Sequence, residues 1–395
     1  MRLLAILALC LLALAPARAQ PADEGGALGE FRAFLASTWP LAREAGVSRR
    51  TFESATAGLA PDPAILARPV RQGEFSMKIS DYVARSVTGA RVEAARRARA
   101  AHGAALAAVE RRTGVPAEII LALWAVETNF GAHQGSTDVL RALATHAVRQ
   151  HRPDLFRDEF VAALVMIEKG YVRRDQLRGS WAGAMGQPQF MPSSYLKHAV
   201  AFSGDEAADI WNSAPDTIAS IGNFMQQSGW RAGSPAIVET TIPDDFDWKP
   251  IDLDFARWRA LGFRRADGGA LPATGAASLY LPEGARGPAF LITDNWEVIR
   301  QYNTSDAYAL SVALIAARIA GGGLARPFPG DAASLSLSDR IAAQRGLAAR
   351  GFYDGTSDGK IGRKTRVAVH AFQIASGMAP ADGFLTPDLV RALKQ

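Results

Sequence analysis

Residues 116–131 have the sequence Pro-Ala-Glu-Ile-Ile-Leu-Ala-Leu-Trp-Ala-Val-Glu-Thr-Asn-Phe-Gly. Proline suits the first turn of a helix and Gly131 can end one, so this stretch predicts a helix between them. Positions 119–126 carry no polar side chain except the indole of Trp124. Nearly every face of such a helix must contact other protein segments. The stretch therefore predicts a buried helix, with one carboxylate, Glu127, near its C-terminal end.

The surroundings predicted for Glu127 suit acid–base chemistry. Helical spacing places Glu127 on the same side as Ile120 and Trp124. An apolar wall and the negative end of a helix dipole both disfavour the ionised carboxylate, which is the condition for a general acid near neutral pH. The alternative is a carboxylate at the edge of the core that pairs with an arginine, because structural ion pairs also perturb carboxylates. This stretch by itself leaves both interpretations open.

The N-terminus has the pattern of an export signal. Arg2 gives the positive start, residues 3–14 are apolar, and Ala17-Arg18-Ala19 forms a typical cleavage site. The apolar run is too short to span a bilayer comfortably, so we expect residues 1–19 to be a cleaved signal peptide. No later segment predicts a transmembrane anchor, because residues 309–320 are apolar but short and contain Arg318.

Cysteine content and charge exclude several classes of function. The single cysteine, Cys10, lies within the predicted signal, and Leu9 before it disfavours a lipoprotein anchor. The mature protein then has no disulfide, no cysteine metal site and no thiol nucleophile. The net charge is +5 in 395 residues, with the charges interspersed. This weak basicity favours an anionic polymer as a partner, whereas nucleic acid is not expected outside the cytoplasm.

A second unusual stretch is Gly179-Ser-Trp-Ala-Gly-Ala-Met-Gly-Gln-Pro-Gln-Phe-Met-Pro192. Its glycines and prolines prevent a regular helix, yet its large apolar side chains predict that it is packed against the protein. Ser180, Gln187 and Gln189 then need specific hydrogen-bond partners. The stretch is either a buried structural loop or a loop that lines a substrate site.

The remaining pattern predicts a mainly α protein of the α+β class with a small strand-containing subdomain. Strands are expected at residues 236–242 and 289–293, and a further helix at 305–320. A Gly/Pro/Ala/Ser-rich linker is expected at 321–335, followed by a separate unit at 336–395. Turn-forming sequences divide this unit into three predicted helices, at 338–350, 363–376 and 386–394.

Three stretches resemble the MltB-type lytic murein transglycosylases, the membrane-bound lytic transglycosylase B family. They are Ala125-Val-Glu-Thr-Asn-Phe-Gly131, Gly183-Ala-Met-Gly-Gln-Pro-Gln-Phe-Met-Pro-Ser-Ser-Tyr195 and Arg300-Gln-Tyr-Asn-Thr-Ser305. The tail is similar to a type 1 peptidoglycan-binding domain, in Gly351-Phe-Tyr-Asp-Gly, Asp358-Gly-Lys-Ile-Gly and Ala368-Val-His-Ala-Phe-Gln373. The two resemblances point to the same polymer.

The resemblance implies a lysozyme-like helical catalytic domain at residues 29–320 and a three-helix wall-binding module after it. The family cleaves the β-1,4 bond between N-acetylmuramic acid and N-acetylglucosamine without adding water, and leaves 1,6-anhydro-N-acetylmuramic acid ends. By resemblance, the catalytic residue is Glu127. The substrate-binding residues that it implies are Ser180, Gln189, Phe190, Tyr302, Asn303 and Arg152, the last from the basic pair His151-Arg152.

The residues themselves agree with this chemistry. Glycosidases normally use two carboxylates, and these three stretches supply no convincing second one. The substrate must then assist, through its N-acetyl oxygen and through attack by its own C6 hydroxyl group. Ser180 and Asn303 would hold the N-acetyl group, and Phe190 and Tyr302 would present aromatic faces to the sugar. No cofactor is needed for these steps.

In some family members the segment equivalent to residues 201–209 binds calcium. Ala201 and Ala207 stand at ligand positions here, and only Ser203, Asp205 and Asp216 remain. Because calcium takes six to eight oxygen ligands, we expect a metal-free turn.

Two alternative functions remain from the sequence, a hydrolytic muramidase on the same fold and a non-catalytic wall-binding protein. In every case the expected location is the periplasm and the expected partner is peptidoglycan. Proteins of cell-wall synthesis or hydrolysis are further partners that the resemblance allows. The sequence does not say whether cleavage occurs within glycan strands or at their ends.

Overall fold

The computed structural model describes residues 24–68, 77–149, 152–204, 207–249, 251–330 and 335–395. Four expectations fall outside these ranges: those on the signal peptide at 1–19, Cys10, His151 and Asp205. Within them, no helix is both long and apolar enough to cross a membrane.

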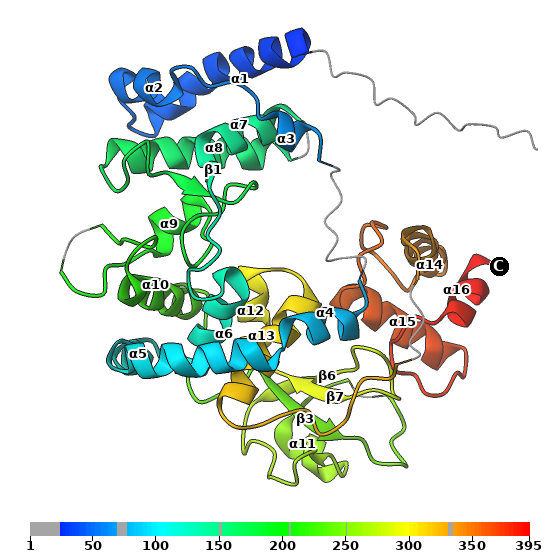
Figure 1. The fold of residues 1–395 in the computed structure, drawn as a ribbon. Coiled ribbons are helices and arrows are strands. Elements are labelled where there is room, and N and C mark those ends of the chain that lie inside the picture. The colour runs from blue at the N-terminus through cyan, green and yellow to red at the C-terminus, as the bar shows by residue number, and fades with distance from the viewer. Residues whose placement is uncertain (1–23, 69–76, 150–151, 205–206, 250, 331–334) are drawn as a thin grey trace, which may run out of the picture.

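Helices from two separate parts of the sequence form a first group, seen at the top of Figure 1. They are α1 (Glu24–Glu44), α2 (Arg49–Thr56), α3 (Pro63–Leu66), α7 (Val139–Val148) and α8 (Pro153–Glu168). The long helices α7 and α8 pack along each other, and α1 covers both. Helix α1 contacts α8 through an edge-to-face pair of aromatic rings, Phe34 and Phe160, whose centres lie 5.4 Å apart.

A second group of helices surrounds the buried helix that the sequence predicts. Its members are α4 (Ile79–Ser86), α5 (Gly89–Thr113), α6 (Ala117–Thr128), α9 (Pro192–His198), α10 (Ala214–Gln227), α12 (Asp294–Tyr302) and α13 (Asp306–Ile319). Helix α6 contacts α5, α10 and α13, so its apolar side chains meet protein on several sides. Every residue from 119 to 125 is buried, which confirms the prediction from its sequence.

The strand-containing part is a five-stranded antiparallel sheet with the order β4-β6-β7-β3-β5. Its strands are β3 (Ile237–Thr241), β4 (Asp252–Asp254), β5 (Arg264–Arg265), β6 (Ala276–Tyr280) and β7 (Ala289–Ile292). Helix α11 (Phe255–Ala260) places Trp258 in a small apolar core against one face of the sheet. Strands β1 (Thr137–Asp138) and β2 (Arg178–Gly179) form a separate short pair beside α7.

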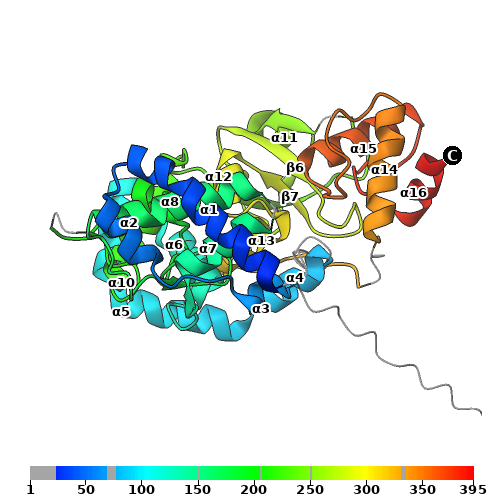
Figure 2. The same ribbon diagram turned by 90° about the horizontal axis from the view of Figure 1, so that it is seen from above.

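The C-terminal residues form three helices around their own apolar core. These helices are α14 (Leu337–Ala349), α15 (Arg363–Ala375) and α16 (Pro387–Lys394). Figures 1 and 2 both show α15 beside β6 and β7, with α14 and α16 on its outer side. The first part of the predicted linker at 321–335 is bound to strand β3. The backbone N–H groups of Ala325 and Arg326 donate to the carboxylate of Glu239 at 2.8 and 2.9 Å.

The predicted fold class is confirmed: the protein is mainly helical with small antiparallel sheets. Most predicted helix boundaries differ from the observed ones by one or two residues. The end of α6 differs because the chain turns at Asn129, in the left-handed conformation, rather than at Gly131. Strands β4 and β6 were not predicted, because their sequences, Asp-Leu-Asp and Ala-Ala-Ser-Leu-Tyr, contain no β-branched residue.

Candidate functional site

The end of helix α6 holds Glu127 in a tightly fixed turn. Asn129, Phe130 and Gly131 all have positive φ angles, a costly run that persists only where the surroundings impose it. Thr128 supplies part of that constraint. Its hydroxyl group donates to the carbonyl of Gln187 at 2.7 Å and accepts from the N–H of Gly131 at 3.0 Å. Glu127 is half-buried at this point.

The hydroxyl group of Tyr308 on α13 donates a hydrogen bond of 2.5 Å to Oε1 of Glu127. Tyr308 is buried, and this burial together with the nearby Glu127 charge raises its pKa well above the usual value. Tyr308 therefore remains a neutral donor at any ordinary pH. The pKa of Tyr302 is raised well above normal too, first by burial and then by the charge of Glu127, which places Tyr302 in the same cluster.

The loop at residues 179–192 packs against α6 through a buried glutamine. The indole Nε1 of Trp124 donates to Oε1 of Gln187 at 3.0 Å, and Nε2 of Gln187 donates to the carbonyl of Trp211 at 3.2 Å. Gln187 thus joins the helix that carries Glu127 to the loop that carries Ser180 and Gln189. The prediction that the polar groups of this loop need specific partners is confirmed.

Ser180 and Gln189 are both half-buried in this loop. The hydroxyl group of Ser180 accepts from the N–H of Ala184 at 3.1 Å, which closes a turn next to β2. Gln189 has a φ angle of 51°, and its amide donates to the carbonyls of Gly186 and Gln134 at 2.9 and 3.1 Å. Both side chains are therefore held by backbone groups.

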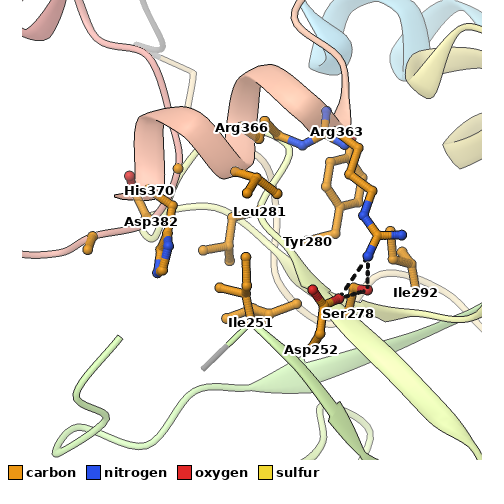
Figure 3. A pocket seen from close by; sticks show the side chains of 14 residues that line it. Ile251, Asp252, Ser278, Tyr280, Leu281, Ile292, Arg363, Arg366, His370 and Asp382 are labelled. Atoms are coloured by element: carbon orange, nitrogen blue, oxygen red, sulfur yellow. Dashed lines mark hydrogen bonds and ion pairs between the residues drawn. The ribbon is translucent and has the colours of Figure 1, made fainter. Parts of the chain in front are cut away.

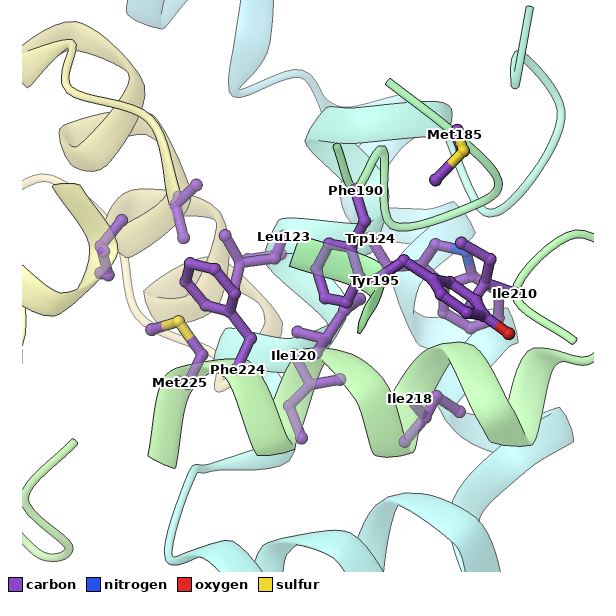
Figure 4. Close-up of a cluster of buried hydrophobic side chains, with 14 of the residues drawn as sticks. Ile120, Leu123, Trp124, Met185, Phe190, Tyr195, Ile210, Ile218, Phe224 and Met225 are labelled. Carbon is purple, nitrogen blue, oxygen red and sulfur yellow. The ribbon is translucent and has the colours of Figure 1, made fainter. Parts of the chain in front are cut away.

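The two predicted aromatic residues differ in exposure. Phe190 is only 2% exposed, and its ring lies 5.8 Å from that of Phe224 and 5.9 Å from that of Tyr302, within the apolar cluster in Figure 4. In this structure the ring of Phe190 therefore has no exposed face to offer a sugar, because it is buried against Phe224 and Tyr302. Tyr302 is half-buried, and its hydroxyl group donates to the carbonyl of Pro188 at 2.6 Å.

Asn303 follows α12 and shares its short connection with Ser305. Its Oδ1 accepts from the N–H of Ser305 at 3.0 Å, and the hydroxyl group of Ser305 caps α13 by accepting from the N–H of Tyr308. Half of the Asn303 side chain is thereby fixed. Among the described residues, no hydrogen bond uses its amide NH₂ group.

Arg152 is not brought to this cluster by any described contact. It is exposed at the N-terminus of α8 with a φ angle of 56°, and its carbonyl accepts from the N–H of Phe156. The sequence motif placed it near the substrate by resemblance, and the fold places it on a different helix group from Glu127.

The segment considered for calcium uses its carboxylates for its own backbone. Asp216 accepts from the N–H groups of Phe202 and Asp209 at 3.1 and 2.8 Å, and Asp209 accepts from the N–H groups of Trp211 and Asn212. Among the described residues, no group of three or more acidic, histidine or cysteine side chains is placed to hold a metal ion. Both described carboxylates are therefore engaged by backbone N–H groups of their own segment.

Tyr308 was not predicted as a site residue from the sequence. The pattern of residues 305–320 predicts a buried helix, and a single tyrosine in such a helix cannot be distinguished from an ordinary core residue. Only the packing of α13 against α6 shows that its hydroxyl group reaches Glu127.

Comparisons with known proteins agree with this geometry. Residues 30–317 match the family model described as a transglycosylase SLT domain, and residues 336–393 match a putative peptidoglycan-binding domain. SltB3 from Pseudomonas aeruginosa, solved in complex with NAG-anhNAM-pentapeptide, is 39% identical, with a TM-score of 0.85 over 92% of this chain and 99% of that one. The soluble lytic transglycosylase SltB1 from the same organism is 30% identical, with a TM-score of 0.63 over 74% of this chain and 98% of that one.

A curated relative adds a partial match. Membrane-bound lytic murein transglycosylase B from Escherichia coli is 41% identical over 126 residues, which are 32% of this chain. The matched stretch spans 35% of the length of that relative.

Proposed function

Since the chain belongs to the transglycosylase SLT domain family, we propose that it is a lytic murein transglycosylase of the periplasm. Its substrate is the peptidoglycan glycan strand, and the bond cleaved is the β-1,4 bond between N-acetylmuramic acid and N-acetylglucosamine. The observation that carries this proposal is the single carboxylate of Glu127, fixed by Tyr308 at the point where α6, α13 and the 179–192 loop meet.

In this mechanism Glu127 acts twice. As the acid, it protonates the glycosidic oxygen, which leaves as the 4-hydroxyl group of N-acetylglucosamine. The N-acetyl oxygen of the muramic acid assists this departure. The C6 hydroxyl group of the same sugar then attacks C1, and Glu127 accepts its proton. No water enters the product, which is a 1,6-anhydro end, and Glu127 returns to its starting state.

A second carboxylate is not provided by the nearby acidic residue on α13. Asp306 lies two positions before Tyr308, but its carboxylate is bound by Arg300, at 2.9 Å, and by Arg366. A carboxylate held by two guanidinium groups is a poor base or nucleophile. The arrangement therefore supports assistance by the substrate rather than a two-carboxylate hydrolysis.

The remaining residues would bind the sugar around Glu127. Tyr302 offers a half-exposed ring, and the NH₂ group of Asn303 is oriented by the bond from Ser305 to its Oδ1. Ser180 and Gln189 would contribute from the loop, and Arg152 from α8. The C-terminal residues would keep the enzyme on the wall, and the N-terminal signal would deliver it to the periplasm.

The test is digestion of purified sacculi by the wild type and by Glu127→Gln, followed by mass spectrometry of the products. We expect E127Q to lose activity by about 10²–10⁴-fold, because the amide can neither donate nor accept the proton. A matched control is Glu118→Gln, in the first turn of the same helix, where Glu118 pairs with Arg99 at the surface. E118Q should retain wild-type activity.

The product masses separate the alternatives. An anhydro end is lighter than a hydrolysed end by one water molecule. Hydrolysed ends from the wild type would identify a muramidase instead. Binding of sacculi without release of any fragment would identify a non-catalytic wall-binding protein.

A further inference from the structure

The C-terminal helices are docked on the catalytic domain by a buried ion-pair cluster. Arg366 of α15 pairs with Asp306, the first residue of α13, and their side chains are 17% and 8% exposed. Asp306 also pairs with Arg300 at 2.9 Å, and Arg300 pairs with Glu297 at 2.8 Å. The guanidinium group of Arg366 lies 4.6 Å from the ring centre of Tyr280 on β6, and Figure 3 shows both side chains together.

This cluster is electrically neutral only when the C-terminal module contributes. Arg300 and Arg366 carry two positive charges, and Glu297 and Asp306 carry two negative charges. Without Arg366 one negative charge is left uncompensated in a largely buried place, which is strongly unfavourable. The start of α13 therefore depends on a residue that lies 60 positions further along the chain.

The same short segment carries groups of the catalytic site. Ser305, which caps α13, is next to Asp306, and Tyr308 follows two residues later with its hydrogen bond to Glu127. Asn303 is bonded to the N–H of Ser305. A shift of Asp306 would move all these groups, because they share one helix start.

We propose that Arg366 is a positioning residue for the reaction: by neutralising Asp306 it holds the start of α13, and through Tyr308 it fixes the carboxylate of Glu127. The wall-binding module is then part of the catalytic structure as well as an attachment to the substrate. This inference rests on the proposed function of Glu127.

A second ion pair between the two parts provides a matched control. Arg363 lies one turn before Arg366 on α15 and pairs with Asp252 of β4 at 2.9 Å, as Figure 3 shows. These side chains are 48% and 53% exposed, and Asp252 is on the sheet rather than on the helix that carries Tyr308. Loss of this exposed pair should have little effect.

The experiment compares Arg366→Gln and Arg363→Gln in the full-length protein on purified sacculi. For R366Q we expect kcat to fall by about ten- to a hundredfold, the scale of a small misplacement of a catalytic group, with KM and sacculus binding within about twofold of wild type. R363Q should keep wild-type kcat. R366K preserves the charge and should retain at least about half of kcat, because Coulombic neutralisation of Asp306 survives.

A pair of variants tests the route through Asp306. If Arg366 acts through this carboxylate, Asp306→Asn should also lower kcat, and R366Q combined with D306N should be no worse than R366Q alone. Should R366Q fail to fold, R366K and D306N still give the comparison. Full activity of D306N, additive losses in the double variant, or equal effects of R366Q and R363Q would overturn the inference. A wild type that forms no anhydro ends would instead contradict the proposed function.

Discussion

The carboxylate of Glu127 accepts a hydrogen bond from a buried tyrosine, Tyr308. A neutral donor can stabilise the ionised carboxylate and then stay in place when the carboxylate takes up a proton. A lysine or arginine in the same place would add a full charge and resist protonation of Glu127. The tyrosine therefore suits the role proposed for Glu127, which acts first as an acid and then as a base.

Replacement of Tyr308 by phenylalanine tests this role. Hydrogen bonds to charged groups contribute about 1.5–3 kcal/mol, so we expect Tyr308→Phe to lower kcat by about ten- to a hundredfold while the ring keeps its packing. The measurement is the initial rate of release of anhydro products from sacculi. Tyr195→Phe is the control, because Tyr195 is also buried and donates to a backbone carbonyl, that of Ala208. Y195F should lose about 1 kcal/mol of stability and keep its kcat.

A Y308F protein with wild-type kcat would show that Tyr308 contributes only packing. A Y195F protein as slow as Y308F would show that loss of any buried tyrosine hydroxyl group slows the enzyme through general loosening. The two variants together separate a chemical role from a structural one.

At the scale of secondary-structure elements, the 179–192 loop depends on glycine where the backbone comes close to another segment. Gly186 has a φ angle of +64°, and a Cβ atom there would lie 2.7 Å from Cγ1 of Ile210 and 2.8 Å from its carbonyl oxygen. The next residue, Gln187, forms the contact with α6. The loop can approach Ile210 and also reach α6 only because position 186 has no side chain.

The Gly186→Ala variant should therefore be clearly destabilised. We expect a loss of about 1–2 kcal/mol for the left-handed backbone and about 1–3 kcal/mol more for the overlap with Ile210. Gly170→Ala is the matched control, because Gly170 has a similar φ angle of +69° and nothing within 4 Å of the added atom. G170A should show only the backbone cost. Equilibrium unfolding in urea measures both, and equal losses would contradict the proposed close contact.

The predicted elements and the observed ones agree wherever the local pattern is strong. Helix α6 and the three C-terminal helices follow from apolar spacing, caps and prolines. Strands β4 and β6 are stabilised by their partners in the sheet rather than by their own sequences. The burial of Phe190 likewise depends on Phe224 and Tyr302, which are distant in the sequence.

Across the whole molecule, buried tyrosine hydroxyl groups link stability to alkaline pH. Burial is the main cause that raises the pKa values of Tyr195, Tyr280, Tyr302 and Tyr308 above the ordinary tyrosine value of about 10. These residues lie near Glu127, beside Ala208 and at the contact with the C-terminal module. In the unfolded chain all four would release their protons near the ordinary value.

Stability should therefore fall as pH rises above about 10, because the unfolded chain then binds fewer protons than the folded one. We expect these tyrosines to ionise together with unfolding rather than one by one. Absorbance of tyrosinate and far-ultraviolet circular dichroism, followed in one alkaline titration, should change in the same pH range. Ionisation of all seven tyrosines before any loss of helix would contradict the burial of these hydroxyl groups.

The C-terminal module is held against the rest of the protein by direct contacts, in addition to its linker. A flexible linker would raise only the local concentration of substrate. Here α15 also forms ion pairs with β4 and α13, and His370 bonds to the carbonyl of Trp248 at 2.6 Å. The described start of the linker is fastened to Glu239. The two parts are therefore mechanically connected.

The sequence by itself determined the helical class, the buried helix that carries Glu127 near its C-terminal end and the loop whose polar groups need partners. It could do so because apolar periodicity, caps and turn residues act over a few positions of the chain. Tertiary structure alone decided that Tyr308 reaches Glu127, that Gln187 joins the loop to α6, that Phe190 is buried and that Arg366 neutralises Asp306. Periodicity shows which face of an element is buried, but the partner on that face is set by the packing of segments far apart in the chain.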